Sequence, residues 1–279
     1  MIQEIAPHTY DNTYRPLPPE ADSYALFYDN HEILLARNGE QIEYPRFRDL
    51  EALNPDIYTD YTYLFSIDSD RFYLLNHISA PVPSRFAMAN TEIFRTAAPQ
   101  HLAFAGITGY QLCQWYRDRH YCGRCGKIMV PDQKERMMYC DSCHNMEYPK
   151  LSPAVIIGVT DGDRLLLSKY AGRSYKKYAL LAGFTEIGET LEETVKREVL
   201  EEVGLRVTNI RYYKSQPWSF SGTLLTGFFC DLDGSDQIRL DESELALAEW
   251  FTRPDIPVDD SRISLTNEMI RIFKECKNI

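Results

Sequence analysis

One short segment, residues 190–205, constrains the fold more than any other part of the chain. Thr190 is followed three residues later by Glu193, which is the capping-box pattern that begins a helix. An apolar residue recurs at every fourth position: Leu191, Val195 and Val199. Such a stripe needs a core to cover it, and Gly204 can end the helix in the left-handed conformation. The segment therefore predicts an amphipathic helix packed on a larger structure.

Three glutamates follow one another on this predicted helix: Glu198, Glu201 and Glu202. Their spacing of three and four residues places them on one face, beside the apolar stripe. Their repulsion costs stability unless a cation lies among them, and carboxylate oxygens are hard ligands that select Mg²⁺ or Mn²⁺. Arg197 is adjacent and could orient or partly neutralise them. For three glutamates alone, an ordinary solvated acidic face is the commoner explanation.

The residues around the glutamates favour the metal site. They follow the pattern G-x5-E-x7-R-E-U-x-E-E-x-G-U, where U is aliphatic. The matching residues are Gly183, Glu189, Arg197, Glu198, Val199, Glu201, Glu202, Gly204 and Leu205. Through this complete box the segment resembles the Nudix hydrolases. The resemblance implies an α+β protein with a Nudix α/β/α sandwich, and metal-dependent hydrolysis of a nucleoside diphosphate linked to another group.

The resemblance also implies roles for individual residues. The ligands of the catalytic Mg²⁺ or Mn²⁺ would be Ala182 through its carbonyl, Glu198, Glu202 and Glu244. Glu249 is an alternative to the last of these. Glu201 would be a further ligand or the general base, and Arg197 would complete the catalytic set. Divalent ions would neutralise the pyrophosphate and lower the pKa of a bound water. Which glutamate deprotonates the water stays open.

Two C-x2-C pairs, fourteen residues apart, precede the box. Their cysteines are Cys122, Cys125, Cys140 and Cys143. This spacing is typical of a zinc ribbon, and four thiolates form a closed structural site for one Zn²⁺ per chain. The alternative, a pair of disulfides or a redox pair, fits a cytoplasmic chain less well. His120 and His144 flank the pairs but are expected at the surface, because four sulfur ligands complete the shell. Charges of both signs in the ribbon give no clear basic face for nucleic acid.

A second informative stretch, S-Q-P-W-S-F-S-G-T, covers residues 215–223. A proline-fixed turn that displays Trp218 and Phe220 suits a flat heterocycle, although an aromatic turn in a core is the alternative. The order of zinc ribbon, box and this motif resembles the NADH pyrophosphatase branch of the Nudix superfamily, whose motif is S-Q-P-W-P-F-P-x-S. The chain departs from that motif at Ser219, Ser221 and Thr223. Loss of two prolines frees the loop backbone.

By position in the motifs, the resemblance implies a set of substrate contacts. They are Glu135, Tyr148, Phe184, Gln216, Pro217, Trp218, Ser219, Phe220, Ser221, Gly222, Thr223 and Thr266. Phe184 would stack on the nicotinamide ring. Thr266 stands where the family has an alanine.

Composition and pattern set the wider organisation. The chain has 279 residues, 44% of them hydrophobic, and a formal net charge of −11, which argues against broad binding to nucleic acid backbone. No apolar run is long enough for a membrane span and no signal peptide is recognised, so we expect no membrane partner and a cytoplasmic protein. We expect three domains: a β-rich N-terminal domain ending in a helical segment over residues 1–118, the zinc ribbon over 119–147, and the Nudix domain over 148–279.

Several elements are expected within these domains. Residues 31–36, 61–67 and 71–75 read as strands, with a hairpin turn at 38–39. Residues 99–118 suggest a helix that two glycines could interrupt. Residues 154–159 and 164–168 read as a hairpin, and residues 267–277 as a closing helix.

The expected function is hydrolysis of the pyrophosphate of NADH or NAD⁺ to nicotinamide mononucleotide and AMP. By family analogy, NAD-capped RNA would be a further substrate and the protein a homodimer. Two alternatives stay open. One is a Nudix hydrolase of ADP-ribose or a dinucleoside polyphosphate. The other is a catalytically silent, nucleic-acid-binding regulator.

Overall fold

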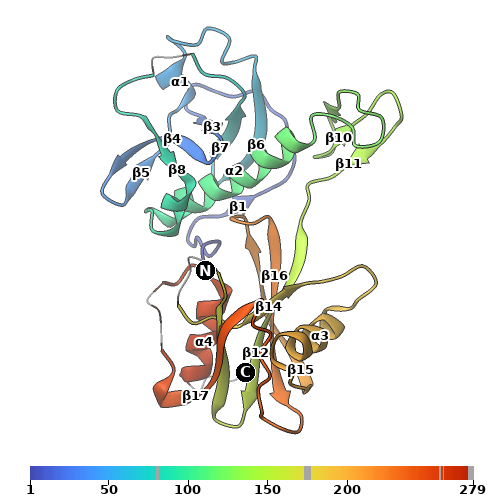
Figure 1. Ribbon diagram of the computed structural model, residues 1–279. Helices are drawn as coiled ribbons and strands as arrows, with labels where there is room; N and C mark the ends of the chain where they lie inside the picture. The colour runs from blue at the N-terminus through green and yellow to red at the C-terminus, as the bar shows by residue number, and fades with distance from the viewer. Residues whose placement is uncertain (80–81, 173–176, 258, 260, 276–279) are drawn as a thin grey trace. The chain divides into compact units, whose positions relative to one another are not determined.

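The computed structural model describes residues 1–79, 82–172, 177–257, 259 and 261–275, and its contacts divide the chain into two compact units (Figure 1). The C-terminal unit comprises residues 1, 151–218 and 222–279, and the N-terminal unit comprises residues 2–150 and 219–221. The three-domain division expected from the sequence is finer than this grouping and stays a prediction.

A mixed sheet forms the centre of the C-terminal unit. Across the sheet the strands are β15 (Val207–Trp218), β16 (Thr223–Leu232), β12 (Ser152–Asp161), β13 (Arg164–Tyr170) and β17 (Leu245–Thr252), with β14 (Leu181–Phe184) paired to β12. Strands β12 and β16 run parallel, and the other pairs are antiparallel. The predicted hairpin over 154–168 is confirmed, because Asp161 pairs with Arg164 across its turn.

Two helices cover the two faces of this sheet (Figure 1). Alternation along β12 divides its side chains between two cores, because successive residues of a strand point to opposite faces. Val155 and Val159 pack in the core that contains Val199 of α3 (Leu191–Val203). Ile156 packs in the other core, with Met269 of α4 (Leu265–Lys274). The predicted α/β/α sandwich is therefore confirmed. A short 3-10 helix, η2 (Arg253–Asp255), follows β17.

The N-terminal unit is rich in strands, as expected. One sheet has the order β1 (Tyr10–Asp11), β6 (Tyr61–Ile67), β7 (Asp70–Leu75) and β2 (Tyr24–Leu26). A second contains β3 (Tyr28–Asp29), β4 (Glu32–Asn38), β5 (Gln41–Glu43) and β8 (Ala87–Asn90). The strands predicted over 31–36, 61–67 and 71–75 are present, and Asn38 pairs with Gln41 across the predicted hairpin turn. The unit also has α1 (Phe47–Leu50) and the 3-10 helix η1 (Thr91–Arg95).

The longest helix of this unit, α2 (Gln100–Asp118), runs unbroken through both glycines that could have interrupted it. A side chain at Gly106 would overlap with the Tyr44 hydroxyl and the Phe94 ring, and one at Gly109 would press on Leu26 and Tyr28. Glycine lowers helix propensity by about 1 kcal/mol, but here it admits the neighbouring rings to the helix backbone. Tertiary packing therefore explains both residues.

The chain ends in the predicted closing helix, although its bounds are shifted. Helix α4 begins at Leu265, two residues before the expected start, because the Ser264 side chain caps it by accepting a hydrogen bond from the Asn267 amide. The end expected at residue 277 lies outside the described residues. Among the described residues, no helix combines the length and the apolar character that a membrane span requires.

Candidate active site and metal centre

Helix α3 is built as its sequence predicts. The Thr190 hydroxyl accepts a hydrogen bond from the Glu193 amide, and the Glu193 carboxylate accepts one from the Thr190 amide at 2.8 Å. Gly204 ends the helix with φ at 69°. Val195 and Val199 are fully buried in the core beneath the sheet. The helix is thus fixed at both ends and along one face, so the backbone positions of its glutamates are well defined.

Two of the three helix glutamates are withdrawn from water. Glu198 is 8% exposed and Glu202 is 2% exposed, whereas Glu201 has an exposed side chain. The Glu198 carboxyl lies directly against the Cα of Gly183 in β14, where any side chain at residue 183 would overlap with it. Burial raises the pKa of Glu198 against the opposing effect of Arg197, and the charges of Glu201 and Glu244 raise it further. A buried carboxylate of this kind favours a nearby cation.

Arg197 connects the carboxylates to the strand that faces them. Its guanidinium donates to Glu189 at 2.6 Å and 3.0 Å, to Glu198 at 2.8 Å and to Glu201 at 3.0 Å. It also donates to the carbonyl of Phe184 at 2.9 Å. The hydrogen bonds from Arg197 lower the pKa of Glu189 to about 2. The same bonds to Glu189, together with those to Glu198 and Glu201, raise the pKa of Arg197 above its usual range. One arginine fork therefore fixes the positions of three carboxylates.

Glu189 matches the box, but sequence reasoning gave it no role. Its carboxylate accepts from Arg197, from the Thr194 hydroxyl at 3.0 Å and from the Glu186 amide at 3.1 Å. These contacts tie the loop before α3 to the helix. The signal that could have found this role is the fixed spacing to Arg197 in the box.

The two candidates for the downstream glutamate differ in surroundings. Glu249 lies in β17 and accepts a hydrogen bond from the Tyr178 hydroxyl at 2.7 Å. Glu244 precedes β17, is exposed, and acts electrostatically on Glu198. Its backbone carbonyl is held by the Ala171 amide at 2.9 Å. Ala182, the predicted carbonyl ligand, is in β14 beside Gly183. The role of Glu244 as a metal ligand stays a prediction, with Glu249 as its alternative.

These residues suit a divalent cation in their chemistry. Four carboxylates (Glu189, Glu198, Glu201 and Glu202) and one guanidinium have a formal net charge of −3. The donors are oxygens, which Mg²⁺ and Mn²⁺ prefer. Arg197 lies between Glu198 and Glu201 and separates their oxygens. Within the described part of the chain, the only three or more His, Cys, Asp or Glu ligand atoms within 4.8 Å of one another belong to cysteines.

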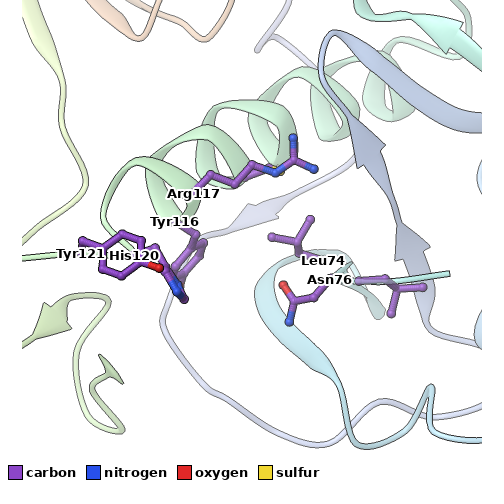
Figure 2. Close-up of a pocket in the computed structure, with 8 residues that line it drawn as sticks. Leu74, Asn76, Tyr116, Arg117, His120 and Tyr121 are labelled. Carbon is purple, nitrogen blue, oxygen red and sulfur yellow. The ribbon is translucent and has the colours of Figure 1, made fainter. Parts of the chain in front are cut away.

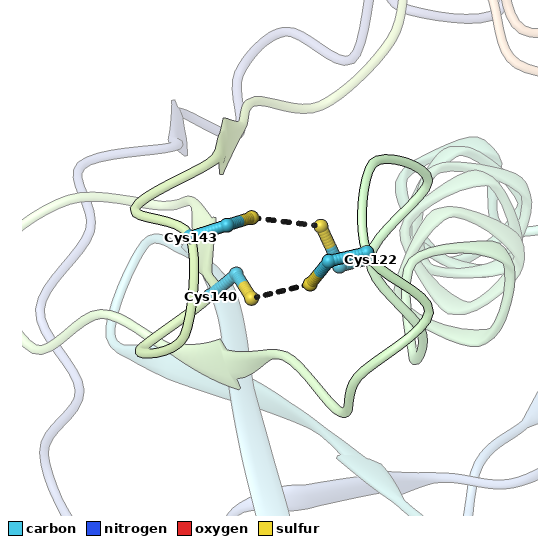
Figure 3. A group of neighbouring side chains, drawn as sticks. Cys122, Cys140 and Cys143 are labelled. Atoms are coloured by element: carbon cyan, nitrogen blue, oxygen red, sulfur yellow. Dashed lines mark hydrogen bonds between the residues drawn. The ribbon is translucent and has the colours of Figure 1, made fainter.

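That cysteine group is the predicted one: Cys122, Cys125, Cys140 and Cys143. Figure 3 shows the thiols of Cys122, Cys140 and Cys143 lying close together between two loops. The sulfur–sulfur distance is 3.6 Å between Cys122 and Cys143 and 3.5 Å between Cys125 and Cys140. A tetrahedral Zn²⁺ with bonds of about 2.3 Å requires sulfur atoms about 3.8 Å apart. The four sulfurs therefore fit a closed structural zinc site.

The two cysteine loops share one backbone design. In each, the carbonyl of the first cysteine accepts from the amide four residues on, namely Gly126 and His144, both at 2.8 Å. Both of these residues have positive φ, 74° and 57°. The Arg124 amide also donates to the Cys122 sulfur at 3.4 Å, and such donors lower the pKa of Cys122, which favours the thiolate. His144 bonds Tyr139 and is no part of the sulfur group.

Short strands and a small core support this ribbon. The strands are β9 (Val130–Pro131), β10 (Met138–Tyr139) and β11 (Met146–Glu147). Trp115 of α2 packs with Met129 and Met138 against Cys122 and Cys140. Two predicted substrate residues also lie in the N-terminal unit, where the Tyr148 hydroxyl donates to the Glu135 carboxylate at 2.7 Å.

The motif over 215–223 forms a hairpin between β15 and β16, and the expected proline turn is wrong in its position. Pro217 lies within β15, paired with Leu224, and the turn is made by residues 219–222. Proline is tolerated there because β15 is an edge strand of the sheet. Gly222 has φ at 65°, and Ser219 and Thr223 are buried.

The other predicted substrate residues fall into three environments. Phe184 and Ser221 are exposed, and Trp218 and Thr266 are partly buried. Gln216 is fully buried, and its side chain bonds backbone groups at residues 263 and 265. Residues 219–221 group with the N-terminal unit, in which the Arg95 guanidinium lies 4.2 Å from the centre of the Phe220 ring.

A cavity of about 480 Å³ lies elsewhere, in the N-terminal unit (Figure 2). Its labelled lining residues are Leu74, Asn76, Tyr116, Arg117, His120 and Tyr121. The Arg117 guanidinium is engaged by the Tyr28 carbonyl, and burial raises the pKa of the Cys113 thiol to about 11, so that thiol is neutral. This lining includes no residue predicted for the active site.

Two segments of the chain match known domain families. Residues 150–274 match the NUDIX domain, and residues 117–148 match the NADH pyrophosphatase zinc ribbon domain. This segment is therefore similar to a Nudix domain. The Nudix domain coincides with the sheet, α3 and α4 described above, and the zinc ribbon domain contains all four clustered cysteines.

Similar proteins include the NAD-capped RNA hydrolase NudC of Shigella flexneri, which is 42% identical over 150 residues. NudC of Escherichia coli (strain K12 / DH10B) is 41% identical over 150 residues. Each match spans 54% of this chain and 58% of the relative, so the chain matches little more than half the length of these proteins. A solved NUDIX hydrolase from Nitrosomonas europaea superposes with a TM-score of 0.48 at 25% identity, over 56% of this chain and 90% of that one.

Proposed function

We propose that the chain is a Nudix pyrophosphohydrolase that cleaves the diphosphate bridge of NADH or NAD⁺, giving nicotinamide mononucleotide and AMP. One observation carries the proposal: the Glu198 carboxyl is buried against the bare Cα of Gly183, with buried Glu202 one turn further along α3. Burying two carboxylates costs folding stability. A helix with a structural role alone does not need buried carboxylates. A site that binds cations against a diphosphate accounts for that cost.

Each residue has a part in the proposed reaction. Glu198, Glu202, Glu244 and the Ala182 carbonyl would hold Mg²⁺ or Mn²⁺, which when bound neutralises the diphosphate and lowers the pKa of a water. Arg197 orients Glu198 and Glu201 and ties both to the Phe184 carbonyl in β14. Glu201 is exposed and is available as a ligand or as the base that takes the proton from the attacking water.

The zinc ribbon domain supports the choice of substrate, because the family description of residues 117–148 names NADH pyrophosphatases. The predicted substrate contacts in the ribbon and in the 215–223 hairpin belong to the same proposal. They are Glu135, Tyr148, Phe184, Pro217, Trp218, Ser219, Phe220, Ser221, Gly222, Thr223 and Thr266, whereas the predicted contact Gln216 is fully buried. Exposed Phe184 would offer its ring face to the nicotinamide.

An NAD cap on RNA is a second candidate substrate, because relatives at 41–42% identity are named NAD-capped RNA hydrolases. The cap presents the same diphosphate bond. The net charge of −11 predicts that the RNA body adds little affinity. We therefore expect the ratio of the turnover rates of capped RNA and free NAD⁺, measured at equal concentration, to change little with salt concentration.

Two further properties belong to this proposal by resemblance to the family. We infer a homodimer in which the aromatic-rich N-terminal half supplies contact surface, and a cytoplasmic location. Light scattering of the purified chain tests the first, and fractionation of the source cells tests the second.

Substrate ranking tests the proposed function. Turnover of NADH, ADP-ribose and diadenosine tetraphosphate is compared at equal concentration with Mn²⁺. We expect NADH to rank first. NADH clearly below the others would assign the site to another Nudix substrate class. No turnover of any of them would favour the catalytically silent regulator.

A further inference from the structure

Gln216 lies at the end of β15, next to Pro217 and Trp218, and its side chain is fully buried. A buried amide must satisfy both a donor and an acceptor, or it costs stability. Its hydrogen bonds therefore show what the residue does in the folded chain.

Both halves of the amide bond the segment that leads into α4. The Gln216 Nε2 donates to the carbonyl of Ile263 at 2.8 Å, and its Oε1 accepts from the amide of Leu265 at 2.7 Å. The Leu265 amide is the first of the helix and has no partner within the helix itself. Gln216 thus acts as a cap contributed from a distant strand, in addition to the local Ser264 cap.

The body of α4 is attached to the sheet by other contacts. Glu268 accepts hydrogen bonds from the Tyr213 hydroxyl at 2.9 Å and from Lys214 at 2.7 Å. A side chain at Gly227 would press on Met269, so strand and helix are in close contact there. Docking of the helix therefore has contacts of its own, and the two hydrogen bonds of Gln216 act on residues 263–265.

We propose that Gln216 is a positioning residue for the proposed reaction. It holds residues 263–265, at the start of α4, against the end of β15. Thr266, a predicted substrate contact, directly follows the clamped residue, and Trp218, another, is two residues beyond Gln216. One amide therefore sets the spacing between two substrate-contacting segments. The expected effect on KM rests on the proposed function, whereas the positioning of residues 263–265 does not.

The test uses Gln216→Met, which removes both hydrogen bonds at similar volume, and Gln216→Asn, which keeps an amide too short to reach both groups. Tyr213→Phe is the matched control, because it removes one hydrogen bond between the same strand and helix. Two quantities are measured: KM and kcat for NADH, and the hydrogen-exchange rate of the Leu265 amide in the protein without substrate.

We expect both Gln216 variants to raise KM about tenfold or more, with little change in kcat, and to exchange the Leu265 amide faster. The control should leave both quantities near wild type. A raised KM with unchanged exchange would overturn the proposal in favour of direct substrate contact, and unchanged exchange with unchanged KM would overturn it outright. If the wild-type chain does not turn over NADH, the proposed function fails, while the exchange rate still decides whether Gln216 positions residues 263–265.

Discussion

Replacing Gly183 by alanine tests the contact on which the proposed metal site depends. Residue 183 is in β14, paired with Val155, and its φ is not positive, so the strand itself tolerates alanine. The added methyl group would lie 1.8 Å from the Glu198 carboxyl carbon, which has to move by about 1.6 Å or more to reach an ordinary contact distance of 3.4 Å. Movement breaks the 2.8 Å hydrogen bond from Arg197 to Glu198.

The expected magnitudes follow from that displacement. Losing one hydrogen bond to a charged group costs about 1.5–3 kcal/mol of folding stability, and the flexible glutamate side chain brings the value toward the lower end. A misplacement of about 1 Å in a catalytic group costs about 100-fold in rate. Gly183→Ala should therefore stay folded but lose about 100-fold in kcat for NADH.

Two assays separate this mechanism from general damage. Urea denaturation measures the free energy of unfolding, and chromatography of AMP measures kcat. Gly123→Ala is the control, because a methyl group there meets nothing within 4 Å. In a Glu198→Ala background, Gly183→Ala should cost almost no stability, since the clash has been removed. Near wild-type kcat in a folded Gly183→Ala protein, or an undiminished stability cost in that background, would refute the reasoning.

The remaining predictions concern other parts of the chain. Because Arg197 holds the pKa of Glu189 at about 2, below its usual 4.5, Glu189→Gln should destabilise the protein above about pH 5, and the difference in urea midpoint from wild type should shrink toward pH 2; a constant difference would contradict it. Cys140→Ser should abolish binding of one Zn²⁺ per chain, as measured by a colorimetric zinc assay, and retained stoichiometry would disprove the cluster. Gly106→Ala should destabilise the N-terminal unit by about 1–3 kcal/mol in urea titration through overlap with the buried Phe94 ring; an unchanged midpoint would show that the ring can move.

The sequence was sufficient to predict those elements that are stabilised by interactions between residues close in sequence. The start and end of α3 follow from Thr190, Glu193 and Gly204, whose interactions span a few residues. The cysteine group follows from spacing, because two short loops with left-handed residues at Gly126 and His144 determine where their sulfurs point.

Features that depend on distant partners were not predictable in the same way. The Gln216 amide bonds residues 47 and 49 positions away, and nothing near it in sequence identifies them. Gly106 lowers helix propensity, and its presence within α2 is explained only by the close packing of Tyr44 and Phe94 against the helix backbone. Pro217 signals a turn locally but is accommodated in a strand, because the order of the sheet makes β15 an edge.

The most direct test of the central claim is mass spectrometry of the products formed from NADH and Mn²⁺ by the wild-type chain and by Glu202→Gln. The variant keeps the shape of a side chain that is 2% exposed and removes its charge, so fold and zinc content should persist. We predict reduced nicotinamide mononucleotide and AMP from the wild type and neither product from the variant. Equal product from both proteins would remove Glu202 from the reaction, and dihydronicotinamide with ADP-ribose from the wild type would show that the chain cleaves a different bond.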